Sequence, residues 1–143
     1  MKIRAKEYLE QIAKIDLYIK NKLIERQQWV DVALGVTAEI GNERVQSSGD
    51  KQRMATAVAK YVDIEEELNE QIQSIIDRKR RIISVLEKLD GEEYDFLHMV
   101  YVQHIPLKEV AKIKHYSYSG ATTFHGRALQ HVQHIIDSEC GYL

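Results

Sequence analysis

The chain has 143 residues, enough for one ordinary domain or for a small domain on a helical rod, but not for a large catalytic domain with a separate regulatory one. One proline, 7 glycines, 44% apolar and 29% charged residues fit a mostly helical globular protein better than a sheet protein or a disordered chain. No apolar run reaches the length of a membrane span, and the start MKIRAKEYLEQ lacks the apolar core of a signal peptide. For these two reasons we expect a cytoplasmic protein, and the single cysteine, Cys140, cannot form an internal disulfide and gives no sign of an extracellular one.

Residues 3 to about 34 carry the first helical pattern. Its apolar stripe consists of Leu9, Ile12, Ile15, Ile19 and Leu23, and Tyr8, Trp29 and Val30 can extend it. Charges of alternating sign surround the stripe, which is typical of an exposed helix with one buried seam. Glycines and other turn formers from Gly35 to Asp50 then predict a long loop, and long loops without visible chemistry are often mobile.

Residues 51 to 89 carry the most regular pattern, a heptad repeat that predicts a coiled coil. Its seam is Met54, Val58, Tyr61, Glu65, Leu68, Ile72, Ile75, Lys79, Ile82, Leu86 and Leu89. Glu65 and Lys79 are polar interruptions that can fix the register or the oligomeric state. The first helix can fold back as an antiparallel partner, but apolar side chains beside the seam stay uncovered. We therefore expect self-association, most simply a dimer in which two hairpins form a four-helix bundle.

Asp90-Gly91 breaks the rod and marks a domain boundary. Three helices are predicted beyond it, at residues 92–103, 107–114 and 118–136, and residues 137–143 resemble a frayed tail. The expected fold class is all-α, a long antiparallel helical hairpin followed by a small three-helix domain. The predicted domains are residues 1–90, for oligomerisation, and residues 91–143.

The stretch PLKEVAKIKHYSYSGATTFHGRAL, residues 106–129, predicts two short helices joined by a turn. Leu107, Val110, Ala111 and Ile113 give the first helix an apolar face behind a proline that suits a helix start. Ser117 or Ser119 can cap the second helix. The second helix is expected to pack inward through Ala121, Phe124, Ala128, Leu129 and Val132. This pattern indicates a helix-turn-helix.

The other side of the second helix carries hydrogen-bonding side chains without a carboxylate: Tyr118, Ser119, Thr122, Thr123, His125 and Arg127. A helix that lies in the major groove of double-stranded DNA needs such side chains to reach base edges and phosphates. The net charge of the chain is −2, but residues 104–136 hold four basic residues against one acid, together with five histidines. This local positive charge supports phosphate contacts only modestly.

A family pattern is carried by Leu107, Val110-Ala111, Ile113, Ser117, Ala121 and Arg127-Ala128-Leu129. It resembles the fourth region of sigma-70-type factors. The longer stretch from Leu89 to Gln133 resembles small phage proteins of the ArpU and RinA type, which regulate late genes. The resemblance implies a DNA-binding regulator of phage or prophage genes that uses no cofactor and acts in the bacterial cytoplasm. It implies base contacts by Tyr118, Ser119, Gly120, Thr122 and Thr123, and phosphate contacts by Lys112, Lys114 and Arg127, with His125 added from its place on the polar side.

Two positions depart from that pattern. His115 stands where sigma-type turns usually have glycine, so it must adopt a left-handed conformation or use a different turn. Gly120 lies inside the second helix, where glycine costs about 1 kcal/mol relative to alanine.

The same patterns are compatible with other functions. The domain could contact host RNA polymerase or another phage protein, or the chain could be a small-terminase-like packaging protein. His125, His131, His134 and Cys140 do not have the spacing of a recognised zinc site, so no metal is expected. No motif for nucleophilic catalysis, phosphate binding or a metalloprotease occurs, so the chain is not expected to be an enzyme.

Overall fold

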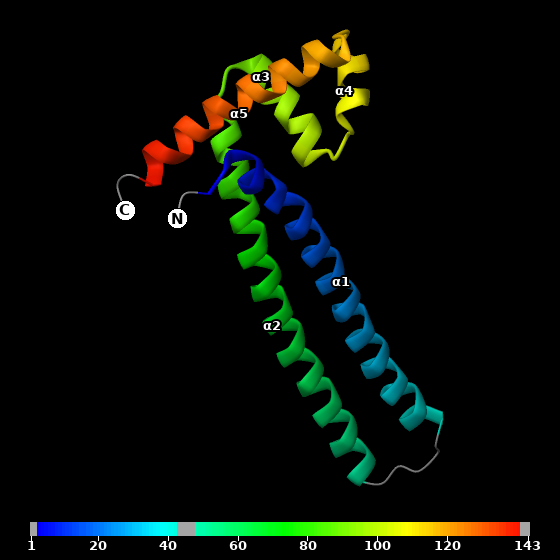
Figure 1. The fold of residues 1–143 in the computed structure, drawn as a ribbon. Helices are drawn as coiled ribbons and strands as arrows, with labels where there is room; N and C mark the ends of the chain where they lie inside the picture. The colour runs from blue at the N-terminus through cyan, green and yellow to red at the C-terminus, as the bar shows by residue number, and fades with distance from the viewer. Residues whose placement is uncertain (1–2, 43–47, 141–143) are drawn as a thin grey trace. The chain divides into compact units, whose positions relative to one another are not determined.

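The computed structural model describes residues 3–42 and 48–140. Helix accounts for 89% of the residues and no strand occurs in the described ranges, so the all-α prediction is confirmed. Figure 1 shows the elements in chain order. They are α1 (Ala5–Asn42), α2 (Ser48–Leu86), α3 (Gly91–Leu97), the π-helical turn η1 (His98–Val102), α4 (Leu107–Lys114) and α5 (Tyr118–Cys140). None of the helices, as far as they are described, is both long and apolar enough to cross a membrane.

The chain divides into two compact units. Unit 1 consists of Met1–Asp16 and Asp77–Leu143, and unit 2 is Leu17–Ile76. This division by packing differs from the predicted domains, 1–90 and 91–143, because the first turns of α1 and the last turns of α2 pack with the helices that follow. The backbone N–H of Ala5, for example, donates to the side-chain oxygen of Gln133 on α5 at 2.7 Å.

Unit 1 is built around apolar side chains from all of its helices. Those that are almost completely buried include Leu9, Ile12, Val85, Leu86, Phe96, Leu97, Val110 and Val132. The ring of Phe96 on α3 lies 5.0 Å from that of Phe124 on α5, centroid to centroid. Burying eight such side chains supplies most of the stabilisation available to a small helical unit. Phe96 of α3 therefore packs against α5 in this core.

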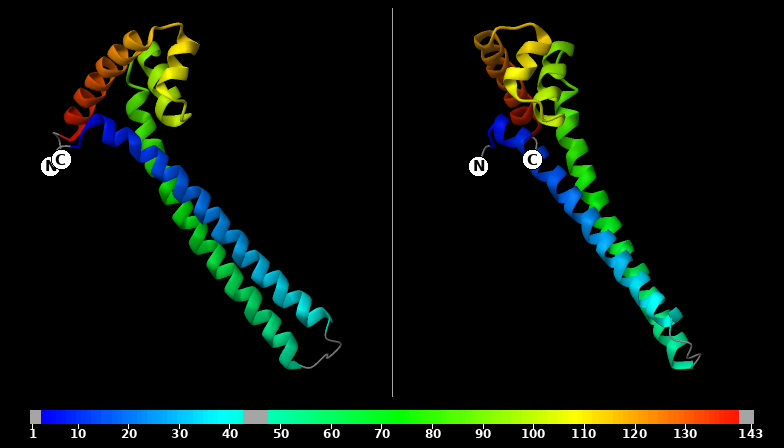
Figure 2. Two further views of the ribbon diagram at one scale, coloured as in Figure 1. Left: turned by 45° about the vertical axis from the view of Figure 1, so that its right-hand side comes forward. Right: turned by 90° about the vertical axis from the view of Figure 1, so that its right-hand side faces the viewer.

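Unit 2 is a pair of antiparallel helix segments, α1 beyond Asp16 and α2 before Asp77, which lie side by side in all three views of Figures 1 and 2. The predicted heptad seam of α2 is buried at Leu68 and Ile72. At Met54 and Val58 the same seam is exposed. A polar contact lies on this helix pair, because Arg26 Nη1 donates to Asn69 Oδ1 at 3.2 Å.

The predicted loop between the two long helices is shorter than expected. We expected it to span residues 35–50, but α1 continues through Gly35 to Asn42 and α2 already begins at Ser48. Residues 43–47 of that loop lie outside the described residues. A glycine inside a helix costs only about 1 kcal/mol, which the helix-forming residues around Gly35 offset. A breaker signal of this strength therefore does not end a long helix by itself.

Three other expectations need correction. The predicted helix 92–103 is α3 followed by the π-helical turn η1, and Asp90 caps α3 by accepting from the backbone N–H of Glu93 at 2.9 Å. The predicted tail is helical up to Cys140, where α5 ends. Ile113 is exposed and does not extend the buried face of α4. Ile113 follows the fully buried Val110 by three residues and so lies on the same side of the helix, but near its end, where its side chain is half exposed.

Candidate nucleic-acid interface

The connection between α4 and α5 is defined by backbone hydrogen bonds. The backbone N–H groups of His115 and Tyr116 donate to the carbonyls of Lys112 and Ala111, at 3.2 and 2.8 Å. This is the Schellman pattern that closes a helix around a left-handed residue. His115 has a φ of 61°, so it takes the left-handed conformation that the glycine of sigma-type turns would take. The strain of a non-glycine residue there costs on the order of 1 kcal/mol.

The start of α5 is capped by Ser117. Its Oγ accepts a hydrogen bond from the backbone N–H of Gly120 at 3.0 Å, as expected for a serine cap. A Cβ on Gly120 would lie 3.0 Å from the same Oγ, tighter than ordinary van der Waals contact. Gly120 therefore has a local structural role, since a side chain there would crowd the cap.

Beyond the cap, α5 exposes a polar strip. Ser119, Thr122, Thr123 and Arg127 are all exposed, whereas Ala121 and Ala128, on the other side of the helix, are fully buried. No Asp or Glu occurs from Ser117 to Ile136. The strip therefore presents donors, acceptors and one fixed positive charge without the carboxylates that would repel a phosphate.

The two threonines of the strip are held by their own helix. Thr122 Oγ1 donates to the carbonyl of Tyr118 at 2.8 Å, and Thr123 Oγ1 donates to that of Ser119 at 3.1 Å. The hydrogen of each hydroxyl is thus bonded to the backbone, so each threonine can offer a ligand only the lone pairs of its oxygen and its methyl group. A threonine in this state can accept a hydrogen bond from a base amino group or contact the methyl group of thymine.

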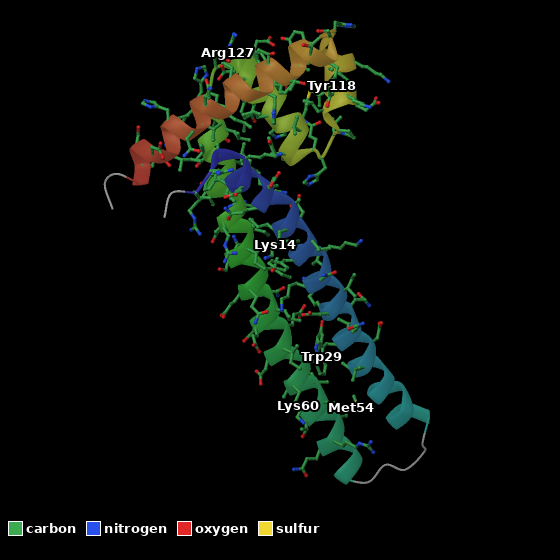
Figure 3. The ribbon with its side chains drawn as sticks, viewed as in Figure 1. Lys14, Trp29, Met54, Lys60, Tyr118 and Arg127 are labelled. Atoms are coloured by element: carbon green, nitrogen blue, oxygen red, sulfur yellow. The ribbon has the colours of Figure 1, made fainter. Side chains whose placement is uncertain are left out.

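Tyr118 and Arg127 mark the extent of the strip along α5 (Figure 3). The Tyr118 side chain at the helix start is 55% exposed, although it is a large aromatic group. Arg127 has no ion-pair partner among the described residues. Gln130, which sequence reasoning missed, is exposed one turn further along the same strip. Its position three residues after Arg127 was the signal that could have identified it.

His125 does not lie on the polar strip, contrary to expectation. It is half-buried, and its Nε2 lies 2.8 Å from the hydroxyl of Tyr101, with the two rings stacked at 5.8 Å. Burial lowers the pKa of His125, with a smaller effect from the positive charge of Lys6, and burial raises the pKa of Tyr101 to about 12. At neutral pH the pair is therefore an uncharged part of the packing, unsuited to phosphate binding.

The two lysines that were expected to meet phosphates differ from each other. Lys112 is exposed, with only a 3.5 Å contact to Glu109 on its own helix. Lys114 forms an ion pair with Asp95 on α3, and its side chain is only 20% exposed. The hydrogen bond to Asp95 raises the pKa of Lys114, so the ammonium group is charged but already paired. Lys112 and Arg127 are thus the better candidates for phosphate contacts.

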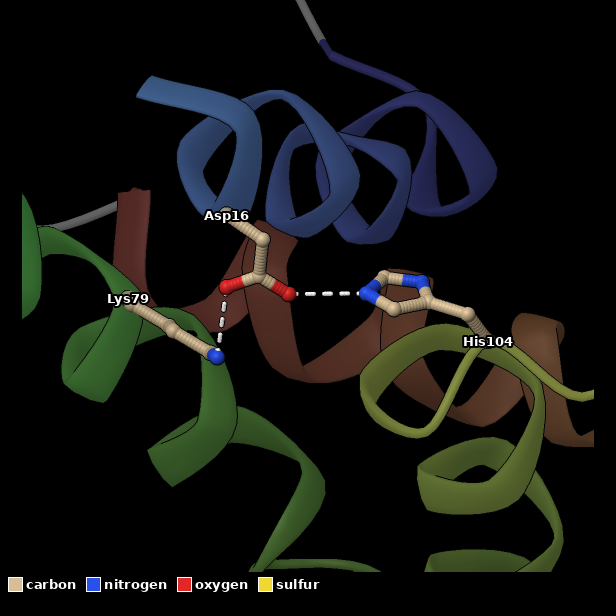
Figure 4. A network of polar contacts seen from close by, with 3 residues as sticks. All are labelled: Asp16, Lys79 and His104. Atoms are coloured by element: carbon tan, nitrogen blue, oxygen red, sulfur yellow. Dashed lines mark hydrogen bonds and ion pairs between the residues drawn. The ribbon is translucent and has the colours of Figure 1, made fainter. Parts of the chain in front are cut away.

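The carboxylate of Asp16 contacts both α2 and the segment that precedes α4. Asp16 on α1 accepts from Lys79 Nζ at 2.6 Å and lies 2.7 Å from His104 Nε2 (Figure 4). His104 has a left-handed φ of 58° in the segment that leads into α4. Burial acts to raise the pKa of Asp16, but the hydrogen bonds and charges of Lys79 and His104 outweigh it and hold the pKa below 3.8. The sequence marked Lys79 as a polar interruption of the seam but did not identify Asp16 as its partner.

A second carboxylate, Glu93, is buried under α5. Both of its side-chain oxygens lie within 2.7 Å of His131 Nδ1, so the histidine is held in a structural contact. Among the described residues, no group of three or more His, Cys, Asp or Glu side chains is arranged to hold a metal ion.

The comparisons with known proteins add no relative to this description. No family model, curated protein or solved structure matches the chain.

Proposed function

We propose that the chain is a sequence-specific DNA-binding regulator of transcription, in which α4 and α5 act as a helix-turn-helix and α5 enters the major groove. One observation carries the proposal: the first half of α5 exposes a polar strip without carboxylates, while its other side is buried in unit 1. The major groove is wide enough for one α-helix, and base edges there are read by such side chains.

The proposed contacts divide into two classes. Tyr118, Ser119, Thr122 and Thr123 would meet base edges, and Gly120 would allow the backbone to approach the duplex. Lys112 and Arg127 would meet phosphates, which fix the position of the helix but do not read sequence. Lys114 and His125 are left out of this set, because the first is paired with Asp95 and the second is packed against Tyr101.

The resemblance to ArpU- and RinA-type proteins and to sigma region 4 extends the proposal to the control of phage or prophage late genes. A dimer would read two half-sites, whose centres on one face of the duplex lie ~34 Å apart or a multiple of it. The fold proposed for this purpose is a helical hairpin for oligomerisation followed by a small helix-turn-helix domain.

Two alanine substitutions test the proposal by selection from a randomised duplex pool. Arg127→Ala should weaken binding to all sequences alike and reduce the salt dependence by about one phosphate contact. Thr122→Ala should instead change which base is preferred at one position, at a cost of roughly 1–3 kcal/mol for the best sequence. An unchanged preference in Thr122→Ala, or no enriched sequence with the wild-type chain, would contradict base reading by α5.

A protein-interaction role is the second candidate, because three large apolar side chains are exposed around the turn before α5. They are Ile113, Tyr116 and Tyr118. Exposed apolar groups gathered in this way are typical of protein contacts. Under this alternative the chain would bind host RNA polymerase or a phage protein. A gel-shift series with phage genomic fragments separates the two, since an interaction module would prefer no fragment over bulk DNA.

A further inference from the structure

Unit 2 holds most of the large apolar residues that are exposed in the described part of the chain. Twelve large apolar residues are exposed in the described ranges, and nine of them lie between Leu17 and Val62. A single surface leucine or valine is ordinary, but a concentration of this kind marks an interaction site. All nine lie on the two helices of this unit, and two of them, Trp29 and Val32, line a groove between these helices.

The groove has a volume of about 700 Å³ and lies between α1 and α2. Its apolar lining comes from Trp29, Val32 and Ala33 of α1 and from Ala57, Tyr61 and Ile64 of α2. Trp29 is 46% exposed and Val32 is 55% exposed. Figure 3 shows Trp29 and Lys60 at neighbouring levels of this helix pair. Large aromatic side chains dominate the energetics of protein interfaces, so Trp29 is the natural anchor of a contact.

The charges on α2 beside the groove fall into two blocks of opposite sign. Residues 51–60 hold Lys51, Arg53 and Lys60 without an acid, whereas residues 63–70 hold five acids without a base. The acids are Asp63, Glu65, Glu66, Glu67 and Glu70. None of these eight side chains forms an ion pair with another residue in the described part of the chain. Each block is therefore available to a partner of the opposite charge.

We propose that the groove beside Trp29 binds a second copy of this chain, with the two α2 helices antiparallel across a two-fold axis near Lys60. In this orientation the basic block of each copy meets the acidic block of the other, and Arg53 faces Glu67 of the partner. Arg53, Lys60 and Glu67 are spaced by seven residues, so they lie on one face of α2, and Arg53 and Lys60 line the groove. The inference rests on the dimer that the proposed function includes and adds its surface and its orientation.

The self-complementary charge pattern is the reason for choosing a second copy. A parallel arrangement would place base against base and acid against acid, which is unfavourable. A partner of uniformly acidic or basic surface would match only one block. A two-fold contact forms the Arg53–Glu67 pair twice with the same residues, as isologous interfaces do, and places Lys60 at the axis opposite its own copy.

The first test follows mass and tryptophan emission together over a concentration series without DNA. Trp29 is the only tryptophan, so its emission reports this groove alone. The molar mass should rise from 16.6 kDa to twice that value, and the emission should shift to shorter wavelength over the same concentrations. Val32→Gln should weaken dimerisation roughly tenfold. Val62→Gln is the matched control, because Val62 is comparably exposed at 43% but does not line the groove.

The second test determines the orientation by charge exchange. Arg53→Glu and Glu67→Arg should each weaken the dimer, and the double variant should restore it, since the two blocks again face opposite charges. The single variants change the net charge in opposite directions, so a loss in both cannot come from net charge. The double variant also keeps the net charge of the wild-type chain and tests the proposal even where Val32→Gln fails to fold.

A chain that stays at the monomer mass at all concentrations would overturn the inference, as would a dimer in which Trp29 emission does not shift. Equal effects of Val32→Gln and Val62→Gln, or no rescue by the double charge exchange, would assign the contact to another surface or a parallel orientation. Because no DNA is present, these outcomes are independent of base reading by α5. A monomer that still selects one duplex sequence would retain the proposed function and reject only this interface.

Discussion

Asp16 shows how one side chain can join three segments of unit 1. Its carboxylate accepts hydrogen bonds from α2 through Lys79 and contacts the segment before α4 through His104. Because that segment contains a left-handed histidine, the carboxylate also stabilises a backbone conformation that is otherwise strained. The position of α4 therefore depends on a residue almost ninety positions earlier in the chain.

Asp16→Asn should lower the free energy of unfolding by about 1 kcal/mol at pH 7, a modest value because the pair is partly exposed to water. The folded-state pKa of Asp16 is lowered, so its stabilising contribution is present above about 3.8 and is lost as the pH falls through the folded-state value. Urea unfolding should accordingly show a difference between wild type and variant at pH 7 that shrinks below pH 3.8. Equal stability at pH 7 would contradict this account of the network.

His125, a half-buried neutral group, gives a pH dependence of the same sign as Asp16 but at higher pH. Its pKa is lowered from 6.5, so the unfolded chain binds a proton more readily and stability is lost as the pH falls below 6.5. In His125→Gln, which keeps a hydrogen-bonding partner for Tyr101, the unfolding free energy should depend less on pH in that window. His134→Gln removes an exposed histidine from the same helix and serves as the control. An unchanged pH dependence in His125→Gln would show that burial does not keep the imidazole neutral.

Single positions were predictable when neighbours on the same helix decided their environment. Ala121 and Ala128 are buried as the three- and four-residue spacing indicated. His125 was misplaced because its environment is set by Tyr101, a residue from η1 whose approach no local pattern reveals. Asp16 was missed for the same reason, since its partnership with Lys79 depends on the register between two helices.

A single hydrogen bond to Ser117 fixes the residue at which α5 begins. Ser117→Ala should destabilise unit 1 by about 1 kcal/mol, because the N–H of Gly120 loses its acceptor at the start of α5. Ser119→Ala is the matched control and should change stability by less than about 0.5 kcal/mol, as expected for an exposed residue outside the cap. Thermal unfolding of both variants measures the difference. A larger loss in Ser119→Ala than in Ser117→Ala would contradict the assigned cap.

At the scale of elements, strong patterns located the helices and weak breakers did not. The range 107–114 agrees with α4, and Asp90-Gly91 separates α2 from α3. Gly35 failed as a stop signal because its cost is small compared with the stability of a long helix. The π-helical turn η1 was not predicted, because the apolar spacing of residues 92–103 is equally compatible with a continuous α-helix.

At the scale of the whole molecule, the distribution of charge matters more than its sum. The net charge is only −2, yet α5 has a strip without carboxylates and α2 has one basic and one acidic block. The first supports a nucleic-acid partner and the second supports a second copy of the chain, so one chain would carry two interfaces of different chemistry. The heptad pattern predicted self-association from sequence. The groove could not be predicted in this way, because it forms only where α1 and α2 pack together.

The central claim is that the first half of α5 is the surface that contacts DNA. Titration of the isotope-labelled chain with a short random-sequence duplex at low salt tests it residue by residue. The account predicts that the amide resonances of Tyr118 to Arg127 shift first, together with Lys112, while those beside Trp29 do not move. Shifts concentrated in unit 2, or none at all at saturating duplex, would contradict it.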